Sequence, residues 1–185
     1  MTPGSDTKAK IMEATYEALC EHGYATLSIE KIASRLDMEK SAIYYHFDDK
    51  DDLLSSFLTF MEKKIRQQVP LDDAEPEERL DHFLAMALGT GNRDKWEFRK
   101  ALFEMQSEGP HNPAFADAFR DIHELMQNTL TQILNDLGVD RSTEQAEYMF
   151  YCIEGIMASK IGENDASDLE RLHSRIKNYF TEEGA

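Results

Sequence analysis

The chain has 185 residues, and 36 Asp and Glu against 20 Lys and Arg give it a formal net charge of −16 at pH 7. This length fits one domain, or a small domain joined to a medium one. No stretch of about 18 apolar residues is present and the first residues do not resemble a secretory signal, so we expect a cytoplasmic protein without a membrane span. The acidic excess argues by itself against a polyanionic partner.

The composition predicts an all-α fold. Glycine and proline are rare, at 9 and 5 residues, while Ala, Leu, Glu, Met, Lys and Gln are plentiful. The two cysteines, Cys20 and Cys152, lie far apart in the sequence. We expect both to be reduced thiols, with a disulfide or a redox switch as the alternative.

Three helices are predicted at the N-terminal end. Periodic apolar residues and a closing glycine predict the first over 7–23. A second, short helix follows with Thr26 or Ser28 as its N-cap, and a third runs over 39–46. Two short helices joined by a turn of about three residues are typical of a helix-turn-helix unit.

The third helix is predicted to present an aromatic outer face. With Ile43 turned inward, the helical projection sends Ser41 and Tyr45 outward. Ala42 and Tyr44 fall on the flanks of that face. Tyrosine hydroxyls can donate to phosphate oxygens or lie against base edges. The alternative is that these aromatic side chains simply close the core of a small domain.

Residues 23–54 resemble the DNA-binding region of the TetR/AcrR family of transcriptional repressors. The resemblance implies a helix-turn-helix DNA-binding domain over 5–65 and a C-terminal ligand-binding and dimerisation domain over 66–185. It also implies a homodimer that places two recognition helices in successive major grooves of a palindromic operator. The similar positions are Gly23–Tyr24, Ile32–Ala33, the Tyr44–Tyr45–His46–Phe47 stretch, Lys50 and Leu53.

The DNA contacts implied by this resemblance and by the helical projection fall on eight residues. They are Ser28, Lys40, Ser41, Ala42, Tyr44, Tyr45, His46 and Lys50. The chain departs from the family pattern at the turn, where Asp37–Met38–Glu39 replaces the usual Gly-Val-Ser. Because Asp tolerates the left-handed conformation, the turn is still expected, whereas the carboxylate of Glu39 leaves the preferred base sequence open.

The C-terminal part is predicted to be a helical bundle with a ligand pocket. A proline-rich acidic connection over 69–79 precedes helices near 77–90, 94–107, 112–138, 142–162 and 166–181. Apolar pockets between bundle helices are common ligand sites. The candidate ligand-binding residues, most of which could equally be core, are Trp96, Phe98, Phe103, Phe115, Phe119, His123, Met126 and Tyr151.

Two classes of effector fit these residues. The aromatic and methionine side chains favour a hydrophobic or acyl-chain ligand. Trp96 with Glu97, Glu104 and Glu154 would instead suit an organic cation. The last two helices carry wide apolar stripes, and Gly155 permits close approach, so we expect a four-helix interface between two copies.

The sequence therefore predicts a DNA-binding transcriptional regulator, specifically a repressor that a small molecule releases from its operator. The alternative is a helix-turn-helix-derived protein-interaction module that no longer binds DNA. An enzyme is not expected, because no nucleophile–base pair, phosphate-binding glycine loop or metal motif is present, and no cofactor is expected either.

The acidic excess is interpreted as adaptation to a halophilic, high-salt cytoplasm. Because the Debye length is about 3 Å at 1 M salt, attraction to phosphate loses most of its reach there. A DNA-binding protein in such a cell is expected to rely on close contacts and shape.

Overall fold

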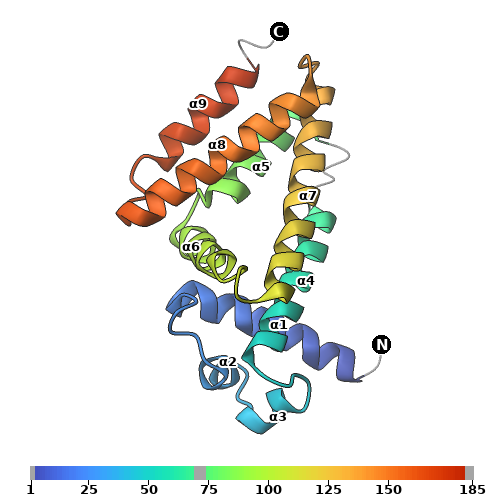
Figure 1. The fold of residues 1–185 in the computed structure, drawn as a ribbon, viewed down its shortest axis with the longest axis vertical. Coiled ribbons are helices and arrows are strands. Elements are labelled where there is room, and N and C mark those ends of the chain that lie inside the picture. Colours follow the sequence, from blue (N-terminus) through green and yellow to red (C-terminus); the bar gives the residue numbers. More distant parts are fainter. Residues whose placement is uncertain (1–2, 69–73, 182–185) are drawn as a thin grey trace.

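The structure is a computed structural model that describes residues 3–68 and 74–181 (Figure 1). These residues contain α-helices and no strand, which confirms the all-α prediction. None of the described helices is long and apolar enough to cross a membrane. In chain order the helices are α1 (Pro3–His22), α2 (Ile29–Arg35), α3 (Lys40–Tyr44), α4 (Lys50–Gln68), α5 (Pro76–Leu88), α6 (Arg93–Ser107), α7 (Pro113–Asp136), α8 (Ser142–Glu163) and α9 (Leu169–Thr181).

Local signals explain where the N-terminal helices begin and end. Gly23 closes α1 with a φ of 68°, and the Ser28 side chain caps α2 by accepting from the backbone N–H of Lys31 at 3.4 Å. Asp37 has a φ of 51°, so the turn uses the left-handed conformation that an aspartate tolerates. Helix α3 is shorter than predicted, because Glu39 provides no side-chain cap and the chain continues after Tyr44 as a turn.

The five later helices lie within a few residues of their predicted positions. Asn92 and Asn112 cap α6 and α7 with their side chains. Part of the predicted connection over 69–79, namely residues 69–73, lies outside the described residues. The rest is shorter than predicted, because α5 already begins at Pro76. The expected boundary between the DNA-binding domain and the C-terminal domain, at residues 65 and 66, falls inside α4.

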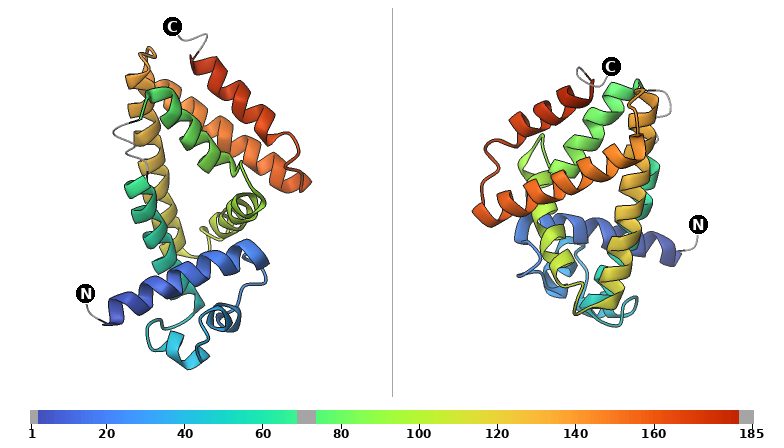
Figure 2. Two further views of the ribbon diagram at one scale, coloured as in Figure 1. Left: turned by 180° about the vertical axis from the view of Figure 1, so that it is seen from behind. Right: turned by 45° about the horizontal axis from the view of Figure 1, so that its top comes forward.

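Two hydrophobic cores fill the molecule. The N-terminal core is formed by α1 to α4 together with part of α6 and the first half of α7. The C-terminal core is formed by α5, α8 and α9 with Trp96 of α6 and the second half of α7. Figure 2 shows α7 running beside α4 and on to α8, so α7 joins the two cores. Cys20 and Cys152 are both free and half-buried.

Candidate functional site

Two exposed tyrosines lie at the C-terminal end of α3, Tyr44 in its last position and Tyr45 as its C-cap. Tyr45 is 86% exposed and Tyr44 is 44% exposed, and Ser41 beside them is also exposed. On the opposite side, Ile43 and Phe47 are buried and anchor α3 in the N-terminal core. Helix α3 lies at the end of the molecule remote from α8 and α9 (Figure 1). Its aromatic face is therefore free to contact a partner.

Two lysines flank this face, and both are held by neighbouring side chains. Lys40 forms an ion pair with Glu30 of α2, and its Nζ lies 5.5 Å from the ring centroid of Tyr44. The hydrogen bond from Lys40 lowers the pKa of the Glu30 carboxyl to about 2. Lys50 lies over the Tyr24 ring at 4.9 Å, and burial lowers its pKa. The positive charge beside α3 is thus partly compensated within the protein.

The remaining predicted DNA-contacting residues lie at the edge of α3 or on α2. His46 is half-buried, with 5.1 Å between its ring centroid and that of Tyr45. Ala42 is half-buried on the flank. The hydroxyl of Ser28 accepts the N-cap hydrogen bond from Lys31. The structure therefore brings the predicted residues together around one end of the molecule.

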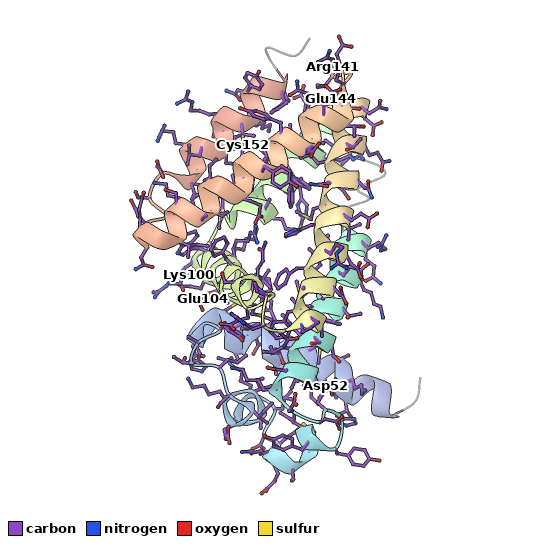
Figure 3. All side chains as sticks on the ribbon, viewed as in Figure 1. Asp52, Lys100, Glu104, Arg141, Glu144 and Cys152 are labelled. Atoms are coloured by element: carbon purple, nitrogen blue, oxygen red, sulfur yellow. The ribbon has the colours of Figure 1, made fainter. Side chains whose placement is uncertain are left out.

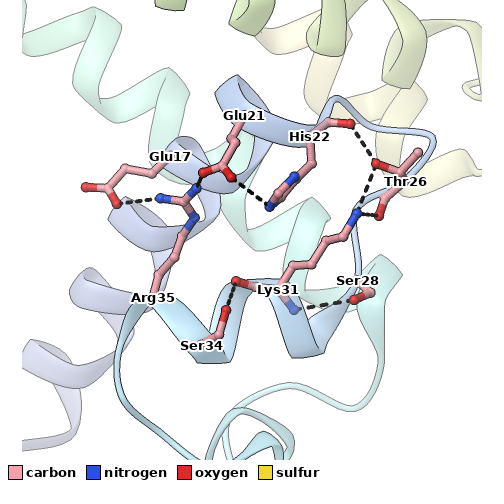
Figure 4. Close-up of polar contacts among 8 residues, drawn as sticks. All are labelled: Glu17, Glu21, His22, Thr26, Ser28, Lys31, Ser34 and Arg35. Carbon is pink, nitrogen blue, oxygen red and sulfur yellow. Dashed lines mark hydrogen bonds and ion pairs between the residues drawn. The ribbon is translucent and has the colours of Figure 1, made fainter.

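A network of polar contacts sets α2 against α1 (Figure 4). Arg35 donates to Glu17 at 3.2 Å and forms a second ion pair with Glu21. The Lys31 Nζ donates to the carbonyl oxygen of Thr26 at 2.7 Å. Sequence reasoning missed this network, although the spacing of the two glutamates places them one helical turn apart on α1. Acids of α1 and α2 therefore pair with Arg35 and Lys40.

A cavity of about 850 Å³ lies between the two cores. Its walls come from α1, α4, α5, α6, α7 and α8. Figure 3 draws the side chains of these helices on the ribbon. The volume is within the range of roughly 300–1,000 Å³ that is usual for small-molecule sites. Four of the predicted ligand-binding residues line this cavity, namely Phe98, Phe119, His123 and Met126.

The other four predicted ligand-binding residues do not line this cavity. Phe115 and Trp96 are buried in the N-terminal and C-terminal cores, respectively. Phe103 is half-buried, and Tyr151 is 62% exposed on the outside of α8. For Tyr151 the reason is helical phase. It directly follows the lining residue Phe150, and one step along a helix rotates a side chain by about 100°.

The N-terminal helices supply lining residues that the sequence did not indicate. Tyr16 of α1 lies against Phe98, with 4.5 Å between the ring centroids, and Phe60 of α4 also faces the cavity. Phe150 of α8 lies 5.2 Å from the His123 ring. These residues read as ordinary core positions in the sequence, because their joint placement depends on how distant helices pack.

A largely buried ion pair interrupts the apolar part of the wall. Arg99 of α6 forms an ion pair with Glu154 of α8, and its Nε donates to the carbonyl oxygen of Ala87 at 2.8 Å. His123 lies near this pair, and burial lowers the pKa of its imidazole. Among the described residues, no group of three His, Cys, Asp or Glu is placed to hold a metal ion. The cavity thus offers an aromatic surface with one polar corner.

Comparisons with known proteins agree with the helix-turn-helix geometry. Residues 11–57 match the family described as bacterial regulatory proteins, tetR family. The crystal structure of a TetR transcription regulator from Haloarcula marismortui is 29% identical, covers 97% of this chain and 98% of its own, and superposes with a TM-score of 0.80. The chain is thus similar over its whole length to a TetR-family transcriptional regulator, and its helix-turn-helix region matches the family model. The resemblance noted in the sequence is therefore confirmed.

Two further TetR-like structures share this fold. A transcriptional regulator from Saccharomonospora viridis in complex with choline is 22% identical, with a TM-score of 0.78 and coverage of 96% of this chain and 97% of its own. The regulator FadR from Bacillus subtilis in complex with stearoyl-CoA is 19% identical, with a TM-score of 0.69 and coverage of 94% and 97%. The matched family model and the shared fold are those of TetR transcriptional regulators.

Proposed function

We propose that this chain is a TetR-family repressor that binds a palindromic operator as a homodimer and leaves it when a small hydrophobic molecule occupies the cavity. One observation carries the proposal: α6 and α7 line the cavity and also bury side chains in the core that supports α3. Phe98 and Phe119 face the cavity, while Met105 and Phe115 of the same helices lie in the N-terminal core. A ligand between these helices would shift their arrangement by its differential affinity for the two states.

On this proposal, α3 enters the major groove with its N-terminal half and its tyrosines toward the bases. The Lys40 and Lys50 ammonium groups and the Ser28 hydroxyl would contact the phosphate backbone, which positions the protein without reading sequence. The proposed DNA-contacting set is Ser28, Lys40, Ser41, Ala42, Tyr44, Tyr45, His46 and Lys50.

The proposed partner for α8 and α9 is a second copy of the chain. Tyr148, Tyr151 and Tyr179 are 64%, 62% and 54% exposed, which is unusual for side chains of this size in one area. Gly155 lies on the same face of α8 as Tyr148, and a Cβ added there would meet nothing within 4 Å. This face is remote from α3 (Figure 1), so pairing through it leaves both recognition helices free.

The proposed effector is hydrophobic, because aromatic, methionine and branched aliphatic side chains form most of the cavity wall. Two TetR-like structures hold choline and stearoyl-CoA, which supports the idea that this fold accepts small molecules. The cationic alternative depended on Trp96, which is buried in the C-terminal core. Of its three carboxylates, Glu154 is already paired with Arg99 and Glu97 with Lys100, and neither Glu97 nor Glu104 lines the cavity.

The decisive experiment is a selection of bound sequences from random duplex DNA, followed by a gel-shift titration with the selected site. Tyr45→Ala is expected to weaken operator binding by roughly five-fold to 150-fold, since a good base contact contributes about 1–3 kcal/mol. Tyr45→Phe removes only the hydroxyl, so comparing the two variants separates the contribution of the hydroxyl to binding from that of the ring. Helicity and dimer size should stay unchanged in both variants, because this side chain is 86% exposed.

Failure of the selection to enrich any sequence, with an intact dimer, would instead favour the protein-interaction module. The titrations belong in molar KCl as well as in dilute salt, because we propose a high-salt cytoplasm for this acidic chain. Stability that does not rise with KCl would remove the high-salt proposal and leave the DNA-binding one intact.

A second variant tests whether the Glu30–Lys40 pair restrains DNA binding. Glu30→Gln frees Lys40 for a phosphate, so operator affinity should rise and the slope of log K against log salt should steepen by about 0.9. Glu124→Gln on α7 is the matched control, because it removes the same charge from an exposed glutamate outside the helix-turn-helix. Equal effects of the two variants would show that only net charge matters.

A further inference from the structure

The charges around the cavity fall into two groups. Glu13 and Lys64 pair at 3.5 Å, with side-chain exposures of 63% and 40%, and Glu17 and Lys95 are exposed as well. Arg99 and Glu154 are different, because their side chains are only 15% and 17% exposed. The first group lies at the exposed rim of the cavity, where solvent screens it. The second group forms a polar corner, where a bound molecule would contact charged side chains that are largely shielded from solvent.

The Arg99–Glu154 corner has no net charge. A carboxylate placed against Arg99 would also approach Glu154, and an ammonium placed against Glu154 would approach Arg99. Removing an ion from water is costly unless the site supplies an unshared opposite charge. His123 does not change this balance, since burial favours its neutral form. A charged head group therefore loses its hydration without gaining a free counter-ion.

The corner still offers one donor and one acceptor. The hydrogen bonds in the structure use Nε and Nη2 of Arg99 and Oε1 of Glu154. Nη1 of Arg99 and Oε2 of Glu154 are thereby left to a ligand, and hydrogen bonds to charged groups are the stronger kind. A head group that both accepts and donates would satisfy both atoms without breaking the ion pair.

We infer that the cavity selects an uncharged amphiphile whose polar head accepts from Arg99 and donates to Glu154, while its apolar body lies against Phe98, Phe119 and Phe150. This inference rests on the proposed function, in which the cavity holds the effector. The ion pair also joins α6 to α8, so a head group bound there would contact helices of both cores.

Calorimetric titration of the full chain with three ligands of equal chain length tests the inference. The probes are decanamide, decanoate and decylammonium at neutral pH. The wild-type chain should bind the amide at least roughly ten-fold more tightly than either ion. Only the amide can both accept from Arg99 and donate to Glu154, whereas each ion can make one of these two hydrogen bonds. Equal or tighter binding of either ion, or binding of none of the three, would overturn the inference.

Two variants give opposite predictions. Glu154→Gln leaves Arg99 unpaired, so decanoate should become the tightest ligand, whereas Arg99→Gln leaves Glu154 unpaired and should favour decylammonium. The double variant restores a neutral corner and should return the preference to the amide. Lys95→Gln removes an exposed rim charge and should leave the order unchanged, and a reversal of preference in that variant would place the selection at the rim. If a single variant does not fold by circular dichroism, the wild-type and double-variant orders still decide.

A gel shift separates this inference from the proposed function. Decanamide binding without release of the selected operator would contradict ligand-controlled repression and leave the head-group preference standing. Operator release by an ion at concentrations where the amide has no effect would support ligand control and overturn the preference.

Discussion

The two cores of the molecule are held together in different ways. In the N-terminal core, large side chains such as Phe57, Ile32 and Ile43 are completely buried among helices that follow one another closely in the chain. The C-terminal core also has filled positions, but its corners are held by polar contacts between distant segments. Arg79 of α5 pairs with Asp136 at the end of α7 at 2.6 Å.

Helix α9 shows the same polar attachment. Asp81 of α5 accepts from Lys177 at 2.8 Å, and the buried His173 ring lies 3.1 Å from the Thr90 hydroxyl. The polar contacts of the N-terminal core, such as those of Arg35 with Glu17 and Glu21, join neighbouring helices of the chain, whereas those of the C-terminal core join segments far apart in the sequence. The C-terminal core therefore depends more on a few corners that only the complete fold brings together. The cavity lies where the two cores meet, and its lining comes from helices of both.

The largest expected effect comes from emptying the N-terminal core. Phe57→Ala should lower the free energy of unfolding by about 3–5 kcal/mol, because a fully buried ring leaves a cavity that its neighbours cannot refill. The matched control is Phe60→Ala, one turn along α4, whose half-buried ring already faces the cavity. We expect it to cost about half as much or less. Urea unfolding measures both, and equal losses would contradict the comparison.

An intermediate effect is expected at a corner of the C-terminal core. Gly89 has a φ of 67°, and an added Cβ would lie 3.0 Å from the carbonyl oxygen of Lys95 and 3.2 Å from the Cα of Trp96. Gly89→Ala should therefore cost about 2–3 kcal/mol, from the left-handed backbone and the clash together.

Gly138→Ala is the control for this corner, because its φ of 77° is similar and nothing lies within 4 Å of the added Cβ. It should cost only about 1 kcal/mol, from the backbone conformation alone. Thermal unfolding of the two variants gives the difference. If both lose the same stability, the close approach of α5 and α6 is not a rigid corner.

The smallest effect is expected where the two cores meet. Burial lowers the pKa of His123 below its ordinary value of 6.5, and the rings of Phe119 and Phe150 and the Arg99–Glu154 pair surround it. Below this value the unfolded chain takes up a proton that the folded chain resists, so stability falls as pH drops through about 6.5. His123→Gln should remove this part of the pH dependence.

The measurement is the unfolding midpoint of both chains between about pH 7.5 and 5.5. The wild-type chain should lose more stability over this interval than the variant, because glutamine does not titrate. Parallel curves would show that His123 is accessible enough to be protonated in the folded chain.

Local chemistry determined the helices and the outer face of α3. The Ser28 cap, the glycine after α1 and the aspartate in the turn act within a few residues, so their consequences are visible in the chain itself. The exposure of Tyr45 followed from its phase relative to Ile43. The same local reasoning located the five later helices and favoured a bundle with a pocket.

Only the tertiary structure decided how the charges pair and which aromatic residues face the cavity. Glu30 compensates Lys40 because α2 crosses α3, and Arg99 meets Glu154 because α6 and α8 face the same space. Tyr16 joins the cavity wall from α1, while Trp96 is buried in a core, although both belong to periodic apolar faces in the sequence. Helical periodicity specifies which side of a helix is buried, whereas the neighbour on that side depends on contacts between segments far apart in the chain.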